Sequence, residues 1–322
     1  MHQFLNHVLM QQDCSKAQGL TQRFSWRYLA EGVLECIPHS HYDCSILISA
    51  GVHGNETAPI EIVDQIVGDL FSGQLILKQR VLFILGHPKA IRAGTRFVEY
   101  DLNRLFCGAW QQHSQSLESS RAKQLEMITA NFFSDPNCTS KKYHYDLHTA
   151  IKPSLLPTFA LIPFSKYAQD QDLVDHLCAA ELDAVVYHSS AGNTFSNFSA
   201  QLSVASVTLE LGKANPFGAN DLADFSAINH VLRAMLSKQA QPIRQKKPIL
   251  QFKVLESIIK HDESFEFHID PTQDNFNIAL KSQIIASDQQ KTYQYLNHDV
   301  YLLFLNPKVK TGLRAGLILQ LF

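Results

Sequence analysis

The sequence has few cysteines, almost no net charge and no long apolar run. Its six cysteines have no C-x-x-C spacing, which argues against a disulfide framework or a thiolate zinc site; they are Cys14, Cys36, Cys44, Cys107, Cys138 and Cys178. A net charge of −2 gives no basic field for nucleic acid or anionic lipid. No run of about 18 apolar residues could span a membrane, and residues 1–14 lack a signal-peptide pattern. We therefore expect a cytoplasmic protein that binds neither nucleic acid nor membrane.

Apolar residues, in contrast, make up 45% of the 322 residues, enough for a large core and two domains. Apolar runs of strand length alternate with stretches of helical periodicity, which indicates an α/β fold. The strands are expected at residues 24–29, 44–49, 81–85, 143–148, 158–162, 184–187 and 204–211. The helices are expected from residue 57 onward and at residues 117–133 and 221–236.

The character of the chain changes near residue 240. Residues 239–248 contain two prolines and clustered charge without apolar periodicity, which is typical of a linker. Short segments with partial alternation follow at residues 249–254, 263–269 and 300–304. We expect a catalytic domain over residues 1–240 and a smaller β-rich domain over residues 241–322.

Two metal-type ligands, His53 and Glu56, follow the apolar run 44–49. In open α/β sheets, ligands gather outside the carboxyl ends of strands, so this loop lies where a site is expected. A helix should follow, with Thr57 as its N-cap. Taken alone, the pair also permits a structural interpretation in which His53 caps a turn and Glu56 is solvated.

A catalytic zinc site needs a third protein ligand and leaves one position for water. His148 is the candidate, because it ends another expected strand, 143–148. His144, on the same strand, is the weaker candidate because it lies nearer the middle of the sheet. Two imidazoles and a carboxylate suit zinc. The alternative for His148 alone is a hydrogen-bonded core histidine.

Residues 92–106 contain Arg92, Arg96 and Arg104, with Asn103 beside the last. Arginine forks bind carboxylates bidentately, and a cation beside a metal can stabilise a developing oxyanion. The alternative is an ordinary charged loop. The segment is therefore a candidate substrate site for an anionic molecule.

Glu210 lies inside an expected apolar strand, just before a Gly-Lys turn. A carboxylate there costs free energy unless it is paired or functional. In a zinc hydrolase one glutamate can serve as the base for water and then as the acid for the leaving amine. The alternative is a salt bridge to Lys213 or to an arginine.

Four segments, taken in order, resemble the succinylglutamate desuccinylases in the aspartoacylase branch of zinc carboxypeptidase-like enzymes. The segments are residues 51–62, Arg96 with residues 101–104, residues 146–148 and residues 208–212. The likeness covers most of the chain. It implies a mixed sheet flanked by helices, followed by a smaller β-rich C-terminal domain.

The resemblance also implies an activity, the hydrolysis of N-succinyl-L-glutamate to succinate and L-glutamate in the succinyltransferase route of arginine catabolism. The partner would be this small anionic substrate, and a homo-oligomer is permitted. The implied roles are one zinc ion held by His53, Glu56 and His148; Glu210 as general base and then general acid; Arg96 polarising the scissile carbonyl; Asn103 and Arg104 holding a substrate carboxylate; and Asp101 orienting His53.

Two alternatives stay open. One is an aspartoacylase-like deacylase of another N-acylamino acid, although residues 201–208 lack the arginine that aspartoacylase relatives have upstream of the catalytic glutamate. The other is a catalytically silent protein that binds zinc or an acidic metabolite; such a protein would be expected to lose Glu210 or a ligand, and all four are present. We also expect residues 191–199, rich in small and amide side chains, to wall the pocket.

Overall fold

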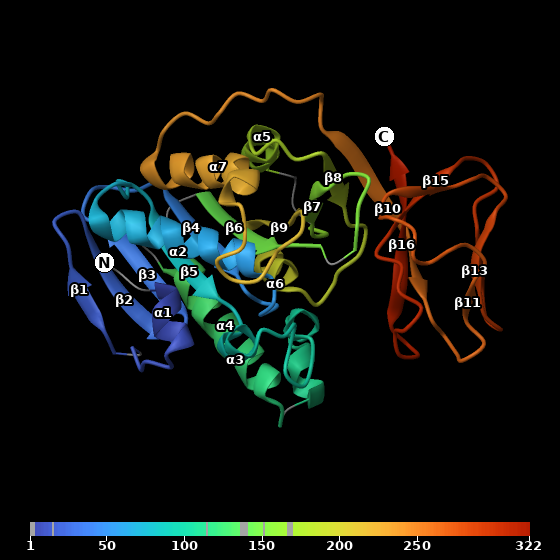
Figure 1. Cartoon of the computed structure of the whole chain (residues 1–322), viewed down its shortest axis with the longest axis horizontal. Coiled ribbons are helices and arrows are strands. Elements are labelled where there is room, and N and C mark those ends of the chain that lie inside the picture. The colour runs from blue at the N-terminus through green and yellow to red at the C-terminus, as the bar shows by residue number, and fades with distance from the viewer. Residues whose placement is uncertain (1–3, 15, 114, 136–140, 151, 166–169) are drawn as a thin grey trace.

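A mixed sheet runs through the whole molecule and carries helices on both faces (Figure 1). The computed structural model describes residues 4–14, 16–113, 115–135, 141–150, 152–165 and 170–322, so Cys138 lies outside the described residues. The sheet order is β1-β2-β3-β5-β4-β6-β9-β7-β8-β10-β16-β15-β12, and β11-β13-β14 form a separate small sheet.

The strands that precede residue 240 are β1 (Gln18–Leu20), β2 (Phe24–Ala30), β3 (Val33–Pro38), β4 (Cys44–Ala50), β5 (Arg80–Leu85), β6 (Lys141–His148), β7 (Thr158–Ile162), β8 (Ala184–Tyr187) and β9 (Ala205–Leu211). Those that follow are β10 (Leu250–Ile259), β11 (Glu266–Phe267), β12 (Asn277–Ala279), β13 (Ile284–Ser287), β14 (Thr292–Gln294), β15 (Val300–Leu303) and β16 (Arg314–Leu321). Strands β5, β4, β6 and β9 are parallel. Every residue of β4 is buried, as expected for a parallel strand covered on both faces.

Helices cover the two faces of the sheet unequally. The helices are α1 (Phe4–Leu9), α2 (Thr57–Ser72), α3 (Pro88–Ala93), α4 (Leu117–Ser134), α5 (Gln171–Ala179), α6 (Phe195–Gln201) and α7 (Ser226–Ser237), with 3₁₀ turns η1 (Leu102–Arg104), η2 (Ala109–His113) and η3 (Leu222–Phe225). Apolar residues of α2, α5 and α7 pack in the core on one face, and those of α4 and α6 pack on the other. No helix in the described ranges is long and apolar enough to cross a membrane.

The C-terminal part continues the central sheet, because β10 pairs in parallel with β8. Residues 239–248 contain neither helix nor strand, in keeping with the expected linker. Beyond it, β10 and β12 to β16 enclose an apolar core of their own. A further apolar cluster joins the two parts, since Phe159 and Val186 pack with Phe252 and Leu317.

Three local expectations were wrong in detail. Glu56, not Thr57, is the N-cap of α2, and the Thr57 hydroxyl instead donates a hydrogen bond to the Asn215 carbonyl. The expected helix 221–236 begins as the 3₁₀ turn η3 before α7 starts. The expected loop 191–199 enters helix α6, which Thr194 caps by accepting a hydrogen bond from the Asn197 amide.

Candidate metal centre

The carboxyl ends of β4, β6 and β9 meet at one edge of the sheet. Their parallel register sets Ala50 beside Leu147 and His148 beside Glu210. After β4 the chain turns through Gly51, whose φ of +64° is unfavourable for side-chain-bearing residues and whose added Cβ would lie 2.8 Å from Ile91. This turn places His53 above the strand end, and the following helix starts at the site.

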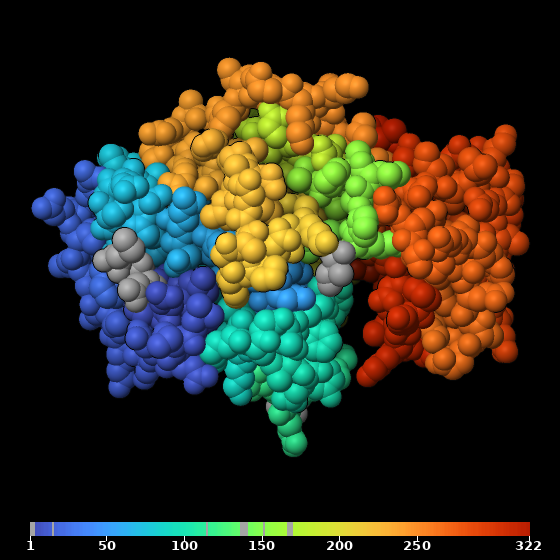
Figure 2. Space-filling model, viewed as in Figure 1, coloured from blue at the N-terminus to red at the C-terminus, as the bar shows by residue number. Residues whose placement is uncertain are grey.

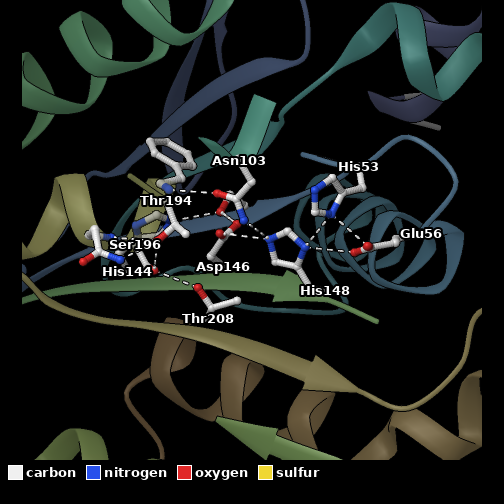
Figure 3. Close-up of polar contacts among 12 residues, drawn as sticks. His53, Glu56, Asn103, His144, Asp146, His148, Thr194, Ser196 and Thr208 are labelled. Carbon is white, nitrogen blue, oxygen red and sulfur yellow. Dashed lines mark hydrogen bonds and ion pairs between the residues drawn. The ribbon is translucent and has the colours of Figure 1, made fainter. Parts of the chain in front are cut away.

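His53, Glu56 and His148 converge on one buried point (Figure 3). His53 Nδ1 lies 2.8 Å from Glu56 Oε1, and His148 Nδ1 lies 2.9 Å from Glu56 Oε2. The two Nδ1 atoms are 3.2 Å apart, and one ligand atom from each of the three residues lies within 4.8 Å of the others. The Thr149 amide also donates to Glu56 Oε2 and fixes the carboxylate.

A carboxylate stands behind each imidazole. Asp101 Oδ1 is 2.9 Å from His53 Nε2, and Asp146 Oδ2 is 3.0 Å from His148 Nε2. When Nε2–H donates to a carboxylate, the Nδ1 lone pair is free to point at a cation. Two imidazole nitrogens and one carboxylate, each oriented in this way, fit a divalent metal ion of the zinc type with room for a further ligand.

The electrostatics of this group match a cation site. Burial disfavours the charged form of Glu56, but the charges of His53 and His148 outweigh it and hold its pKa well below its usual range. Burial likewise disfavours the charged form of His148, yet Asp146 and Glu56 raise its pKa well above its ordinary value. The surroundings therefore favour positive charge at the point where the three side chains meet.

Glu210 lies beside this group, opposite His148 on the neighbouring strand. Its Oε2 is buried without a hydrogen-bond partner, and the described residues provide it with no ion pair, neither Lys213 nor an arginine. Burial, and then the charge of Glu56, raise the pKa of Glu210 to about 7. A carboxylate with a pKa near neutrality, free of structural partners, can accept and return a proton.

Arg96 is the arginine that the structure brings to this group. Its Nη1 lies 3.2 Å from Glu56 Oε1 and its Nη2 lies 3.4 Å from Asp101 Oδ2, while 29% of its side chain remains exposed. The loop from Arg96 to Asp101 is held by Glu118, whose Oε1 accepts from the Val98 and Glu99 amides. Arg96 therefore contacts the group through Glu56 and Asp101 while part of its side chain stays exposed to solvent.

Arg92 lies elsewhere. Its guanidinium pairs with Glu31 and donates to the Val8 carbonyl, so it ties α1 and the β2–β3 turn to α3. Of the three arginines in residues 92–106, Arg92 therefore has a structural role, and only Arg96 and Arg104 stay candidates for the site.

Asn103 and Arg104 differ in exposure although they are neighbours. Asn103 is buried; its Oδ1 accepts from the Phe195 amide and its Nδ2 lies 3.4 Å from His148 Nε2. Arg104 is exposed, and its Nη1 donates to the Asn103 carbonyl. Asn103 therefore holds the start of α6 against the site, and its role as a carboxylate ligand stays a prediction.

Models of two protein families match the chain on either side of the linker. Residues 43–236 match the "Succinylglutamate desuccinylase/Aspartoacylase catalytic domain", and residues 247–321 match the "AstE/AspA barrel-sandwich hybrid domain". The chain belongs to the succinylglutamate desuccinylase/aspartoacylase family. The resemblance drawn from the four sequence segments is confirmed, and so is the fold expected from it.

Individual members of the succinylglutamate desuccinylase/aspartoacylase family are similar over nearly the full length. The succinylglutamate desuccinylase of Serratia proteamaculans (strain 568) is 42% identical over 320 residues, which cover 99% of this chain and 97% of that protein. Among solved structures, the succinylglutamate desuccinylase from Chromobacterium violaceum has a TM-score of 0.88 at 38% identity and the one from Vibrio parahaemolyticus has 0.91 at 33%. These matches cover 99% of this chain and 98% and 94% of the two solved chains.

Sequence reasoning overlooked part of this family member's site, namely the row of polar side chains behind His148. Asp146 Oδ1 accepts from the Ser49 hydroxyl at 2.6 Å, and Ser49 in turn contacts His144 Nε2 at 2.8 Å. Nδ1 of His144 faces the Ser199 hydroxyl at 2.7 Å, so His144 is no ligand of the group described here. Strand periodicity could have found Asp146, because alternate residues of a strand share one face.

Proposed function

We propose that the protein is a zinc-dependent succinylglutamate desuccinylase, which hydrolyses the amide bond of N-succinyl-L-glutamate to give succinate and L-glutamate. The observation that carries the proposal is the convergence of His53, Glu56 and His148 beside the unpartnered carboxylate of Glu210. The near-full-length similarity to proteins of that name supports the choice of substrate. On this proposal the protein acts in arginine catabolism in the cytoplasm.

His53, Glu56 and His148 would hold one zinc ion per chain, with Asp101 and Asp146 keeping the two imidazoles turned toward it. A zinc ion held there would lower the pKa of a water molecule and polarise the scissile carbonyl.

Glu210 removes a proton from the attacking water and later delivers it to the departing nitrogen of L-glutamate. Its pKa of about 7 suits both directions of transfer. Arg96, which contacts Glu56 and is partly exposed, stabilises the negative charge that develops on the amide oxygen. Arg104 donates to a substrate carboxylate from the exposed side of η1, with Asn103 fixing its position.

We also propose that residues 1–240 form the catalytic domain and residues 241–322 the β-rich C-terminal domain. The family matches over residues 43–236 and 247–321 support a boundary near residue 240.

The test is product analysis with the purified, zinc-loaded protein. Equimolar succinate and L-glutamate should form from N-succinyl-L-glutamate, with a kcat/KM well above that for N-acetyl-L-aspartate and N-acetyl-L-glutamate. Preference for an acetylated substrate would replace the proposal with a related deacylase. The absence of turnover of all three compounds by a folded, zinc-loaded protein would favour a silent binding protein.

A further inference from the structure

Two buried titratable side chains, His87 and Glu118, have no part in the chemistry proposed above. They are in direct contact, since His87 Nε2 lies 3.0 Å from Glu118 Oε1. Burial lowers the pKa of His87 and keeps its imidazole neutral at pH 7. The Nδ1 atom of His87 accepts from the Ala90 amide in the first turn of α3, so the ring proton is on Nε2 and is donated to Glu118.

The same oxygen of Glu118 accepts two further hydrogen bonds. The backbone amides of Val98 and Glu99 each donate to Oε1 at 2.9 Å. Burial disfavours the charged form of Glu118, but the hydrogen bonds from the Glu99 amide and from His87 outweigh it and hold its pKa below the usual value. The buried carboxylate therefore stays charged at neutral pH, and hydrogen bonds to a charged acceptor are stronger than those between neutral groups.

The segment that Glu118 holds has few other constraints. Residues 97–100 contain neither helix nor strand and connect α3 to η1. Phe97, Val98 and Tyr100 are exposed, and the teal part of the chain around residue 100 lies on the surface in Figure 2. Among the described residues, Glu118 is the only hydrogen-bond partner of residues 97–100. Exposed loops with few buried contacts open locally at low free energy, so the conformation of this loop depends on Glu118.

Two residues of the candidate site flank this loop. Arg96 precedes it, and its Nη1 lies 3.2 Å from Glu56 Oε1. Asp101 follows it, and its Oδ1 lies 2.9 Å from His53 Nε2. A shift of residues 97–100 would therefore move the guanidinium of Arg96 and the carboxylate of Asp101.

Backbone hydrogen bonds connect both sides of the Glu118 contact to the turn that follows β4. The Gly54 amide donates to the Arg96 carbonyl at 3.2 Å. On the other side, the His87 amide donates to the Gly51 carbonyl at 2.8 Å. Through its three hydrogen bonds, Glu118 thus fixes the loop after Arg96 relative to the turn that carries the first metal ligand.

We propose that Glu118 is a positioning residue for the hydrolysis: it holds the loop that places the Arg96 guanidinium where negative charge develops on the scissile amide. The inference rests on the proposed function, which assigns that role to Arg96. Among the described residues, no contact joins Glu118 directly to His53, Glu56 or His148, so its effect passes through the loop. Charge stabilisation of this kind requires a group already in place, and a displacement of about 1 Å can cost about 10²-fold in rate.

Kinetics of Glu118→Ala at saturating zinc test the proposal. The variant should lower kcat by about 10- to 100-fold, with KM changed by less than about 3-fold. Glu126→Ala is the matched control, because the Glu126 carboxylate of the same helix accepts from the Gly108 amide at 3.1 Å and from the Trp110 indole N–H at 2.9 Å. The control should keep the kcat of the wild type. Equal kcat values for Glu118→Ala and Glu126→Ala would overturn the proposal.

Glu118→Gln is the conservative variant. Its amide oxygen can replace Oε1 as the acceptor for the Val98 and Glu99 amides, so its kcat should lie clearly above that of Glu118→Ala. The same low kcat in both variants would contradict positioning by these hydrogen bonds. Should Glu118→Ala not fold, Glu118→Asp replaces it, because the side chain is one methylene shorter and withdraws the oxygen from the two amides.

The double variant Arg96→Ala/Glu118→Ala separates positioning from a general structural role. If Glu118 acts through Arg96, its removal should have no further effect on kcat once the guanidinium is gone, and the double variant should match Arg96→Ala. A structural defect would lower the active fraction in either background. Fully multiplicative losses would therefore reject the proposed route.

Amide hydrogen exchange, measured on zinc-loaded protein without substrate, separates this inference from the proposed function. Peptides that contain Val98 and Glu99 should exchange at least about 10-fold faster in Glu118→Ala than in the wild type or Glu126→Ala. Unchanged exchange would reject the role of Glu118 whatever the enzyme hydrolyses. If N-succinyl-L-glutamate is not turned over, faster exchange with a lower kcat on the N-acylamino acid that the wild type does hydrolyse would uphold the inference.

Discussion

Strand β6 carries two buried histidines on one face, His144 in its middle and His148 at its carboxyl end, and their surroundings differ in kind. His148 lies between the carboxylates of Asp146 and Glu56, and they raise its pKa well above the usual value despite burial. His144 lies between two hydroxyl groups, and burial lowers its pKa to about 4. The two histidines are four positions apart on the same strand. The surroundings of His148 favour positive charge, whereas those of His144 favour a neutral imidazole.

Hydrogen-bond accounting explains the neutral histidine. Ser49 has one hydroxyl proton and donates it to Asp146, so it accepts from His144 Nε2–H. The unprotonated Nδ1 of His144 then accepts from the Ser199 hydroxyl. Both ring nitrogens of His144 therefore have hydrogen-bond partners while the imidazole is neutral. Nδ1 of His148 instead faces the Glu56 carboxylate, an arrangement that favours a proton or a metal ion between them.

The strongest way to break this comparison is to remove each histidine in turn. His148→Ala should lose bound zinc and nearly all turnover, because it deletes one of three protein ligands. His144→Gln should retain one zinc per chain and measurable turnover. Metal analysis after dialysis, with kcat/KM on the same samples, checks both. Full zinc content in His148→Ala would remove that residue from the ligand set.

Glu210→Gln tests proton transfer beside His148, the cation-favouring histidine of the comparison. The amide keeps the size of the side chain but cannot take a proton from water, so kcat should fall by roughly 10² or more. Zinc content and melting temperature should stay near those of the wild type, because the described structure provides no ion pair that this change would break. A variant with nearly normal kcat would reject Glu210 as the base.

Asp146→Asn sharpens the comparison because Asp146 contacts His148 directly and His144 through Ser49. The substitution removes the negative charge and keeps the size of the side chain. The amide oxygen can still accept from His148 Nε2–H, but it makes the imidazole a weaker donor to the metal. Zinc affinity, measured by competition with a chelator of known affinity, should weaken by about 10- to 100-fold. Unchanged affinity would show that Asp146 has no part in orienting or polarising His148.

The smallest expected effect concerns His144 and pH. Because its folded pKa, about 4, lies below the ordinary value of 6.5, the unfolded chain binds the proton first. The contribution of neutral His144 to the free energy of unfolding is fully present above about pH 6.5 and is lost as the pH falls toward 4. Over this window the loss amounts to about 3 kcal/mol at most. Urea unfolding of metal-free protein should show a steeper loss of stability in the wild type than in His144→Gln. Equal slopes for the two proteins would contradict the neutral state of His144.

The site was predictable where local pattern and strand ends coincide. His53, Glu56 and His148 each follow or end an apolar strand, and parallel strands bring such ends together. Because His144 and His148 lie on the same face of one strand, only their position along it could indicate which of them is the metal ligand. The hydroxyl partners that satisfy His144 come from β4 and α6, and α6 has a polar sequence that hides its helical character.

Long-range juxtapositions were not predictable. Strand β10 extends the central sheet by pairing with β8, and β16 pairs with β10, although no local pattern in these segments specifies the partner strand. Similarly, Arg92 and Arg96 share one segment, and only the fold assigns the first to Glu31 and the second to Glu56.

The central claim, that one metal ion at His53, Glu56 and His148 supports hydrolysis, is tested most directly by a metal titration. Chelator-stripped protein receives increasing amounts of zinc while succinate release from N-succinyl-L-glutamate is followed. We predict negligible turnover without metal and a linear recovery that ends at one equivalent per chain. Full turnover by the stripped protein, or a recovery that needs a second equivalent, would contradict the account.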